Sequence, residues 1–367
     1  MLMSFRRTEI TQKFHFPRNI IVLAVMAFLA TGCASIGPNT IKHDQFDYSD
    51  AMSQALKDQT LLNVVKLRYA DMPMFLEVAS VINSYSLEGS LSAGATFSSD
   101  LPNAQSLGAG AKYTDKPTIT YSPIRGDKFT KSILTPMHPA AIFFLVQSGW
   151  PVDFVFRLAV REINSIKNSI GSTTRGQTGS PEFYILMQAL RRIQLSGDIG
   201  MRMQKNSGRE TSLIFFNKSD TAGIQEDVDF VNKTLGLDPD RSEYRLVFGH
   251  PQNKNEMGVL TRSLLEILVE LAASVQIPPE HLDDKSTIPS HYDLDSEDPR
   301  FQPLIKVNSA KEPPADSYAA ARYQDYWYWI DRSDFKSKRM FTFTMLLFTL
   351  AETGGSQPAP VVTIPAG

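Results

Sequence analysis

The sequence of 367 residues predicts an α+β protein, in which an N-terminal helix and a long amphipathic β-hairpin precede a mixed helix and strand C-terminal domain. Two observations predict this class. Apolar residues recur at helical spacing over residues 49–69, and apolar and polar residues then alternate from residue 81 to residue 114. Beyond residue 125, helical and strand-like segments of ordinary length are mixed, which is typical of an α+β domain.

The alternating segment predicts a β-hairpin over residues 85–121. Between residues 87 and 97 the odd positions carry mainly Leu, Ala and Gly, whereas most even positions carry Ser, Glu or Thr. Turn-like residues 99–103 follow, and a second alternating stretch covers residues 107–114. Because side chains alternate between the two faces of a strand, one face of the hairpin is apolar and the other is polar.

The length of this hairpin suggests a membrane strand pair. If Phe97 pairs near Leu107, about nine residues of each arm face one another, close to the roughly 9 to 11 residues of a tilted membrane-barrel strand. The apolar face is then the candidate membrane-facing surface, formed by Leu91, Ala93, Ala95, Phe97, Leu107, Ala109, Ala111 and Tyr113. Two strands cannot close a barrel, so at least about four copies would each contribute a hairpin to a barrel of about eight strands. The alternative is that this face packs on the helix at residues 49–69.

The remaining elements are expected from shorter local patterns. The Gly-, Ser- and Thr-rich residues 171–179 form the expected domain boundary. Ser180 and Pro181 have the composition of a helix start. Helices are expected at residues 127–134, 139–147, 152–167, 222–235, 260–275 and 335–350, and strands near residues 199–204, 212–216, 244–248, 304–308 and 318–330.

The N-terminus has the features of an export signal. A basic segment is followed by the apolar residues 20–29, by the small residues 30–32 and by Cys33, the only cysteine in the sequence. The apolar run is about half as long as the roughly 20 residues that a transmembrane helix needs. A cleavage site that ends in Gly-Cys resembles the lipobox of bacterial lipoproteins, in which the thiol is acylated and the cysteine becomes the new N-terminus.

The lipobox resemblance implies an organisation and an address. Residues 1–32 would be the lipoprotein signal peptide and residues 33–48 a tether, followed by the segments 49–170 and 180–367. The acyl chains on Cys33, such as palmitate, would bind membrane lipid. Ala34, where an Asp tends to retain lipoproteins at the inner membrane, implies the periplasmic face of the outer membrane.

Two further resemblances concern the rest of the chain. Leu67–Tyr69, Thr261–Leu265, Tyr328–Asp331 and Thr363–Pro365 look like segments of uncharacterised predicted lipoproteins of proteobacteria, which implies no activity. A hairpin contributed by several acylated subunits is similar in architecture to the curli-secretion family of export channels, although none of that family's motifs is present.

Composition argues against a nucleic-acid partner. Residues 1–32 hold four of the 37 Lys and Arg residues and one of the 39 Asp and Glu residues, so the mature chain has 33 basic and 38 acidic residues and a net charge of −5. A negative chain of this kind provides no cationic field for nucleic acid. We therefore expect membrane lipid and either further copies of the chain or an envelope protein complex as partners.

Signatures of catalysis are weak. The sequence has no nucleophile elbow, no zinc-protease motif and no phosphate-binding loop. We expect no enzyme activity, no catalytic residue, no metal and no cofactor. A hydrolase with His250 or His281 as base is a third possibility, although turn or surface positions are expected for these histidines. The acidic residues between 281 and 300 lack the spacing of a calcium loop and favour a solvated loop.

The sequence thus predicts a structural or assembly lipoprotein whose hairpin contributes to an oligomeric barrel pore or export complex. The alternative is an envelope-polymer binding module for peptidoglycan or polysaccharide. In residues 318–330, strand alternation sends Trp327 and Trp329 to one face and Tyr326 and Tyr328 to the other. One face is then core, and Trp327 and Trp329 are the candidate binding aromatics.

Overall fold

The computed structural model describes residues 37–96, 104–170, 177–206, 209–218, 221–290, 292–293 and 296–352. The chain divides into two compact units, Met1–Ala55 and Leu56–Gly367. The described part of the first unit is helical, and the second unit contains the sheets and all other helices of the described residues. The α+β class expected from the sequence is confirmed.

The first helix, α2, covers Gly37–Arg68. Residues 37–48, expected as a tether, are helical. Pro38 does not interrupt this helix, because it stands in the first turn, where a missing N–H is tolerated. Within the second unit the helix buries Leu61 and Val65. It ends where Ala70 adopts a positive φ of 55°.

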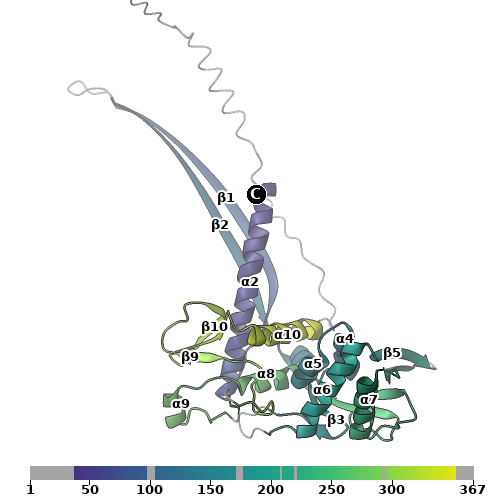
Figure 1. Ribbon diagram of the computed structural model, residues 1–367. Coiled ribbons are helices and arrows are strands. Elements are labelled where there is room, and N and C mark those ends of the chain that lie inside the picture. Colours follow the sequence, from purple (N-terminus) through teal and green to yellow (C-terminus); the bar gives the residue numbers. More distant parts are fainter. Residues whose placement is uncertain are drawn as a thin grey trace, which may run out of the picture. The chain divides into compact units, whose positions relative to one another are not determined.

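The predicted hairpin is present and longer than expected. Strands β1, Leu76–Thr96, and β2, Ala104–Pro123, pair antiparallel along their length and form a two-stranded sheet (Figure 1). At about 3.3 Å per residue the ribbon is roughly 65 Å long. Among the described residues neither strand pairs with a third.

The main sheet of the second unit has six strands in the order β4-β3-β8-β7-β6-β5. All neighbours are antiparallel except the parallel pair β7 and β8. The strands expected near residues 199–204, 212–216 and 244–248 are confirmed. The sheet takes strands from both sides of the expected boundary at residues 171–179. The bounds are β3 Val160–Ile163, β4 Ile166–Lys167, β5 Ile199–Asn206, β6 Arg209–Phe216, β7 Glu243–Phe248 and β8 Glu256–Thr261.

A second sheet has three strands in the order β10-β11-β9, with β9 at Asn308–Ala310, β10 at Ser317–Tyr323 and β11 at Tyr326–Asp331. The strand expected over residues 318–330 is thus two strands. Gln324 and Asp325 form the turn between them, with positive φ values of 45° and 64°. Two consecutive positive φ values are the geometry of a tight two-residue hairpin turn.

Most expected helices are confirmed, and one is partly wrong. The helix expected over residues 152–167 ends at Ala159, after which β3 and β4 turn back through Asn164 and Ser165. The Asn164 main-chain N–H donates to the carbonyl of Gly258, and the Asn164 side chain accepts from the Gly258 N–H, so a distant strand selects this turn. The helices are α3 Gly126–Phe129, the π-helix η1 Thr130–Leu134, α4 Pro139–Gln147, α5 Val152–Ala159, α6 Pro181–Ser196, α7 Ala222–Leu235, α8 Leu264–Ala272, α9 Pro279–Asp283 and α10 Phe335–Glu352.

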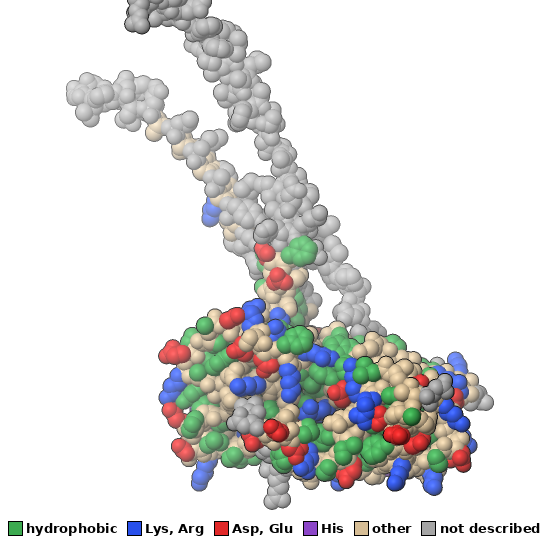
Figure 2. All heavy atoms as spheres, viewed as in Figure 1, with side chains coloured by type: hydrophobic (Ala, Val, Ile, Leu, Met, Phe, Trp, Pro, Cys, Tyr) green, Lys and Arg blue, Asp and Glu red, His purple; other side chains and the backbone are tan. Residues whose placement is uncertain are grey.

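Among the described helices, none by itself has the length and apolar character needed to cross a membrane. The pair Gly126–Leu134 and Pro139–Gln147, bent by 53°, passes this test only when the two are taken together. Ile133, Ile142 and Phe143 of this pair are buried in the core. On the face shown in Figure 2, acidic and basic side chains are interspersed over the described surface.

A buried ion pair lies at the centre of the second unit. Arg262 Nη2 lies 3.3 Å from Glu270 Oε2, and both side chains are almost fully buried. Arg262 also donates to the carbonyls of Arg157, Leu158 and Ser169. The Tyr292 hydroxyl donates to Glu270, and burial together with this carboxylate raises the Tyr292 pKa well above its ordinary value. The pair is therefore satisfied by hydrogen bonds on both sides.

We predict that Glu270→Ala lowers the free energy of unfolding by about 3 to 5 kcal/mol, because it leaves Arg262 buried without its counterion. Urea unfolding followed by circular dichroism measures this loss. The matched control is Arg332→Ala, which removes an ion pair with Asp316 whose side chains are 63% and 64% exposed. That loss should stay below about 1 kcal/mol. Equal losses in the two variants would contradict the role of Glu270 as the counterion of a buried Arg262.

Candidate functional site

The register of the hairpin differs from the expected one. Leu107 lies opposite Ala93, four residues from the expected partner Phe97, which itself lies outside the described residues. The faces are nevertheless retained, because a shift by an even number of residues keeps each side chain on its side of the sheet. Leu91 lies opposite Ala109, and Ser92 lies opposite Gly108.

The polar face of the hairpin is open to solvent. Ser90 faces Gly110, Ser92 faces Gly108 and Ser106 faces Gly94 across the two strands. A Cβ atom on any of these glycines would lie 2.7–2.8 Å from the opposite serine oxygen, so each serine fills the space beside a glycine. Over these six positions the face carries only serines and glycines, and the cross-strand pair Glu88 and Lys112 adds one charge of each sign. The exposed members of the face are Glu88, Ser90, Ser92, Gly94, Ser106, Gly108, Gly110 and Lys112.

The hairpin is attached to the second unit at a closed base. The main-chain N–H of Ile124 donates to the carbonyl of Phe75 over 2.9 Å, which brings the two ends of the hairpin together. Asn63 of α2 holds the chain just before β1. Its Nδ2 donates to the carbonyl of Met74 over 2.8 Å, and its Oδ1 accepts from the Met74 N–H over 2.9 Å. A buried amide thus binds the backbone in the way that a neighbouring strand would.

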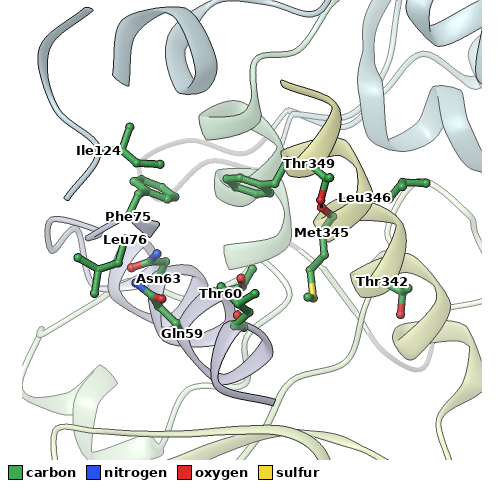
Figure 3. A pocket seen from close by; sticks show the side chains of 12 residues that line it. Gln59, Thr60, Asn63, Phe75, Leu76, Ile124, Thr342, Met345, Leu346 and Thr349 are labelled. Carbon is green, nitrogen blue, oxygen red and sulfur yellow. Dashed lines mark hydrogen bonds between the residues drawn. The ribbon is translucent and has the colours of Figure 1, made fainter. Parts of the chain in front are cut away.

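An apolar pocket of about 340 Å³ lies beside this base. Figure 3 shows Phe75, Leu76 and Ile124 on one side, Gln59, Thr60 and Asn63 of α2 on another, and Thr342, Met345, Leu346 and Thr349 of α10 opposite. The ring of Phe75 stacks on that of Phe348 at 5.9 Å between centroids. The pocket therefore brings α10 beside α2 and the hairpin base, from which it is far apart in the sequence.

Trp327 and Trp329 lie on one face of β11, as the alternation predicts. Tyr326, Tyr328 and Ile330 are buried on the other face. Both Trp side chains are half-buried, and neither is among the partly buried side chains that pack on the described core. Their neighbours on this face are Arg322 and Ala310 beside Trp327, and Ala320 and Asn308 beside Trp329.

The two histidines considered as catalytic bases lie in different surroundings. His250 is exposed and its Nδ1 lies 3.2 Å from Glu162. His281, expected in a turn or on the surface, is buried, and its Nδ1 lies 2.6 Å from the Tyr69 hydroxyl. That hydroxyl is also 2.6 Å from the Tyr328 hydroxyl, and burial raises the pKa of both tyrosines, so they stay neutral near pH 7. His281 is thus a hydrogen-bonded core residue.

The remaining sites named from the sequence are located as follows. Cys33 and Phe97 lie outside the described residues. Within the described part of the chain no group of three or more His, Cys, Asp or Glu side chains has the geometry to hold a metal ion. Sequence reasoning missed Asn63 and Phe75, because a single Asn inside a helix and a single Phe before a strand form no pattern.

Three comparisons bear on the identity of the chain. No protein-family model, no curated protein and no solved structure matches it. The geometry of the hairpin, its base and the aromatic face of β11 therefore supplies the observations from which a function is proposed.

Proposed function

We propose that the protein is a lipid-anchored structural subunit of the bacterial outer membrane, whose hairpin joins those of other copies to form the wall of an oligomeric β-barrel pore or export complex. One observation carries this proposal. A two-stranded ribbon of 21 and 20 residues pairs with no third strand among the described residues.

The edges of this ribbon favour association. An isolated two-stranded hairpin is at best marginally stable in water, and unpaired edges attract further strands. Natural edge strands are usually short or interrupted by proline. Here residues 80–96 and 104–114 contain no proline, and the one irregularity in the pairing lies before them, between Val78 and Ser80, so the edges are regular over this length. Pairing of β1 from one copy with β2 from the next would satisfy the hydrogen bonds of both edges. A ring of such copies would close into a barrel without edges.

The two faces of the ribbon suit such a wall. The exposed polar face is compatible with a water-filled interior. The opposite positions in the sequence are Leu, Ala, Phe and Tyr, which suit contact with lipid. In the observed register the apolar positions Leu91, Ala93, Leu107 and Ala109 are cross-strand neighbours.

The signal-like N-terminus and Cys33 supply the membrane attachment in this proposal. Acylation of Cys33 would hold every subunit at the same membrane surface, which raises the effective concentration of the hairpins. The periplasmic face of the outer membrane is the expected address.

We expect Ala93→Arg to prevent assembly, because an arginine facing lipid near the middle of the membrane costs about 2 to 4 kcal/mol per subunit. Light scattering of the detergent-extracted full-length protein, with the detergent mass subtracted, measures the number of copies. The matched control is Ser92→Arg, which places the same charge on the neighbouring exposed position of the polar face. The proposal fails if the wild-type protein is a monomer or if both variants assemble like the wild type.

The anchor has a separate test. Cys33→Ser removes the thiol that would receive the diacylglyceryl group, so the precursor should keep residues 1–32 and carry no lipid. Intact-mass spectrometry of the membrane fraction distinguishes this precursor from the cleaved, acylated wild type. A Cys33→Ser protein that is still cleaved and lipid-modified would refute the anchor.

The half-buried tryptophans favour a second candidate function, binding of an envelope polysaccharide. Each indole has one alanine neighbour and one polar neighbour, Arg322 or Asn308, on the same sheet face. A sugar ring can stack on an indole while its hydroxyls bond to such polar side chains. Both rings are half-buried, so part of each indole is exposed for contact with a ligand.

For this candidate we expect Trp327→Ala and Trp329→Ala each to weaken co-sedimentation with purified peptidoglycan by about 2- to 10-fold, the range that one aromatic contact supplies. Phe248→Ala is the control, since Phe248 is an aromatic residue on β7 that is 55% exposed. Retained sedimentation in the double Trp variant would exclude this face as the binding site.

A further inference from the structure

Arg68 is a buried cation without an ion-pair partner among the described residues. It is the last residue of α2 and is 1% exposed. Its Nη2 donates to the carbonyl of Ile288, and its Nε has no hydrogen-bond partner in the described part of the chain. This differs from Arg262, which is equally buried but lies beside Glu270.

Nearby groups compensate the charge of Arg68 only in part. The C-terminus of its own helix supplies about half a negative elementary charge. Tyr69 is the one side chain that raises the Arg68 pKa, and its own pKa is raised by burial, so it is neutral near pH 7. Burial has the larger effect and lowers the pKa of Arg68. A buried guanidinium in such surroundings is stabilised by an anion.

Arg68 lines a pocket of about 240 Å³ that contains a second unsatisfied group. The hydroxyl of Ser274, a residue that is 6% exposed, has no hydrogen-bond partner among the described residues. Val275, Leu282 and Pro303 add apolar wall. The lining also includes Gln276, Ser290 and Tyr292, and the hydroxyls of Ser290 and Tyr292 already donate to Ala273 and Glu270. A cation, an unsatisfied hydroxyl and an apolar wall are the lining expected for a small amphipathic anion.

Residues 287–290 form a loop that is hydrogen-bonded to Arg68 and to the end of α8. Thr287 Oγ1 donates to the carbonyl of Arg68 over 2.7 Å, and Ser290 Oγ donates to the carbonyl of Ala273 over 2.5 Å. The Ile288 carbonyl between them accepts from the guanidinium. The carbonyl oxygen thus accepts one of the hydrogen bonds that a carboxylate would accept from the guanidinium, but it does not neutralise the charge of Arg68.

We propose that this pocket binds a small organic carboxylate, with Arg68 neutralising its charge and Ser274 donating a hydrogen bond to one of its oxygens. The guanidinium fork matches the planar carboxylate group. A single buried cation balances a monoanion, whereas phosphate near pH 7 carries more charge than the pocket offsets. This site is independent of the hairpin assembly and of the tryptophan face.

Thermal unfolding of the full-length protein in detergent tests the proposal, with sodium propionate titrated at constant ionic strength and sodium phosphate as the comparison. Propionate should raise the Tm saturably by a few degrees, and phosphate should not. Ser274→Ala should raise the propionate concentration that gives half of the maximal Tm shift by about tenfold. Arg332→Met is the matched control, because it removes an exposed arginine, and it should respond like the wild type.

Arg68→Met should abolish the response. It should also leave the ligand-free protein at least as stable as the wild type, because an uncompensated buried charge is removed. Should this variant fail to fold, Arg68→Lys replaces it. Lysine keeps the charge but lacks the forked guanidinium group, so this variant should need at least about tenfold more propionate for the same Tm shift. An unchanged response in either variant, or equal and unsaturable effects of propionate and phosphate, would overturn the proposal.

Discussion

The buried pair of Arg262 and Glu270 connects segments that the chain otherwise keeps apart. The arginine binds carbonyls at the end of α5 and after β4, and the glutamate accepts from Ser169 and Tyr292. The strand β8, the helix α8 and the loop that carries Tyr292 are thereby fixed around one point. Because each charge is costly in a dry interior unless the other is present, these segments reach their positions together. The six-stranded sheet, and with it the platform that carries the hairpin, depends on this arrangement.

Elements with strong local signals were predictable from the sequence. Helices α4 and α6 begin with proline at the first helical positions, and α6 and α7 end at glycines in the left-handed conformation. The faces of the hairpin followed from its period of two. Elements that depend on distant partners were not predictable. The turn at Asn164 exists because Gly258 of another strand binds it, and the apolar pattern of the preceding helix gives no sign of this contact.

The same distinction applies to the candidate sites. Trp327 and Trp329 were assigned to one face correctly, since alternation is a local property. Asn63 acquires its role only when Met74 returns to α2, and His281 is buried only because Tyr69 and Tyr328 meet around it. Nothing in the sequence around Arg68 indicates that its charge has no ion-pair partner among the described residues, because its burial depends on the distant loop at Ile288, whose carbonyl accepts from it. A sequence shows that a residue is charged, but it does not show whether that charge is exposed to water, paired or buried.

The closed base of the hairpin allows the core of the second unit and the hairpin to fold at different times. The main-chain N–H of Ile124 donates to the carbonyl of Phe75, and among the described residues β1 and β2, which lie between them, pair only with one another. The rest of the second unit can therefore complete its core while the two strands of the hairpin are still unpaired, since the entropic cost of closing a loop rises only slowly with its length. The two long edges of the ribbon, which pair with no third strand among the described residues, are then presented only by a chain whose core is already folded, and this order limits mispairing with the strands of that core.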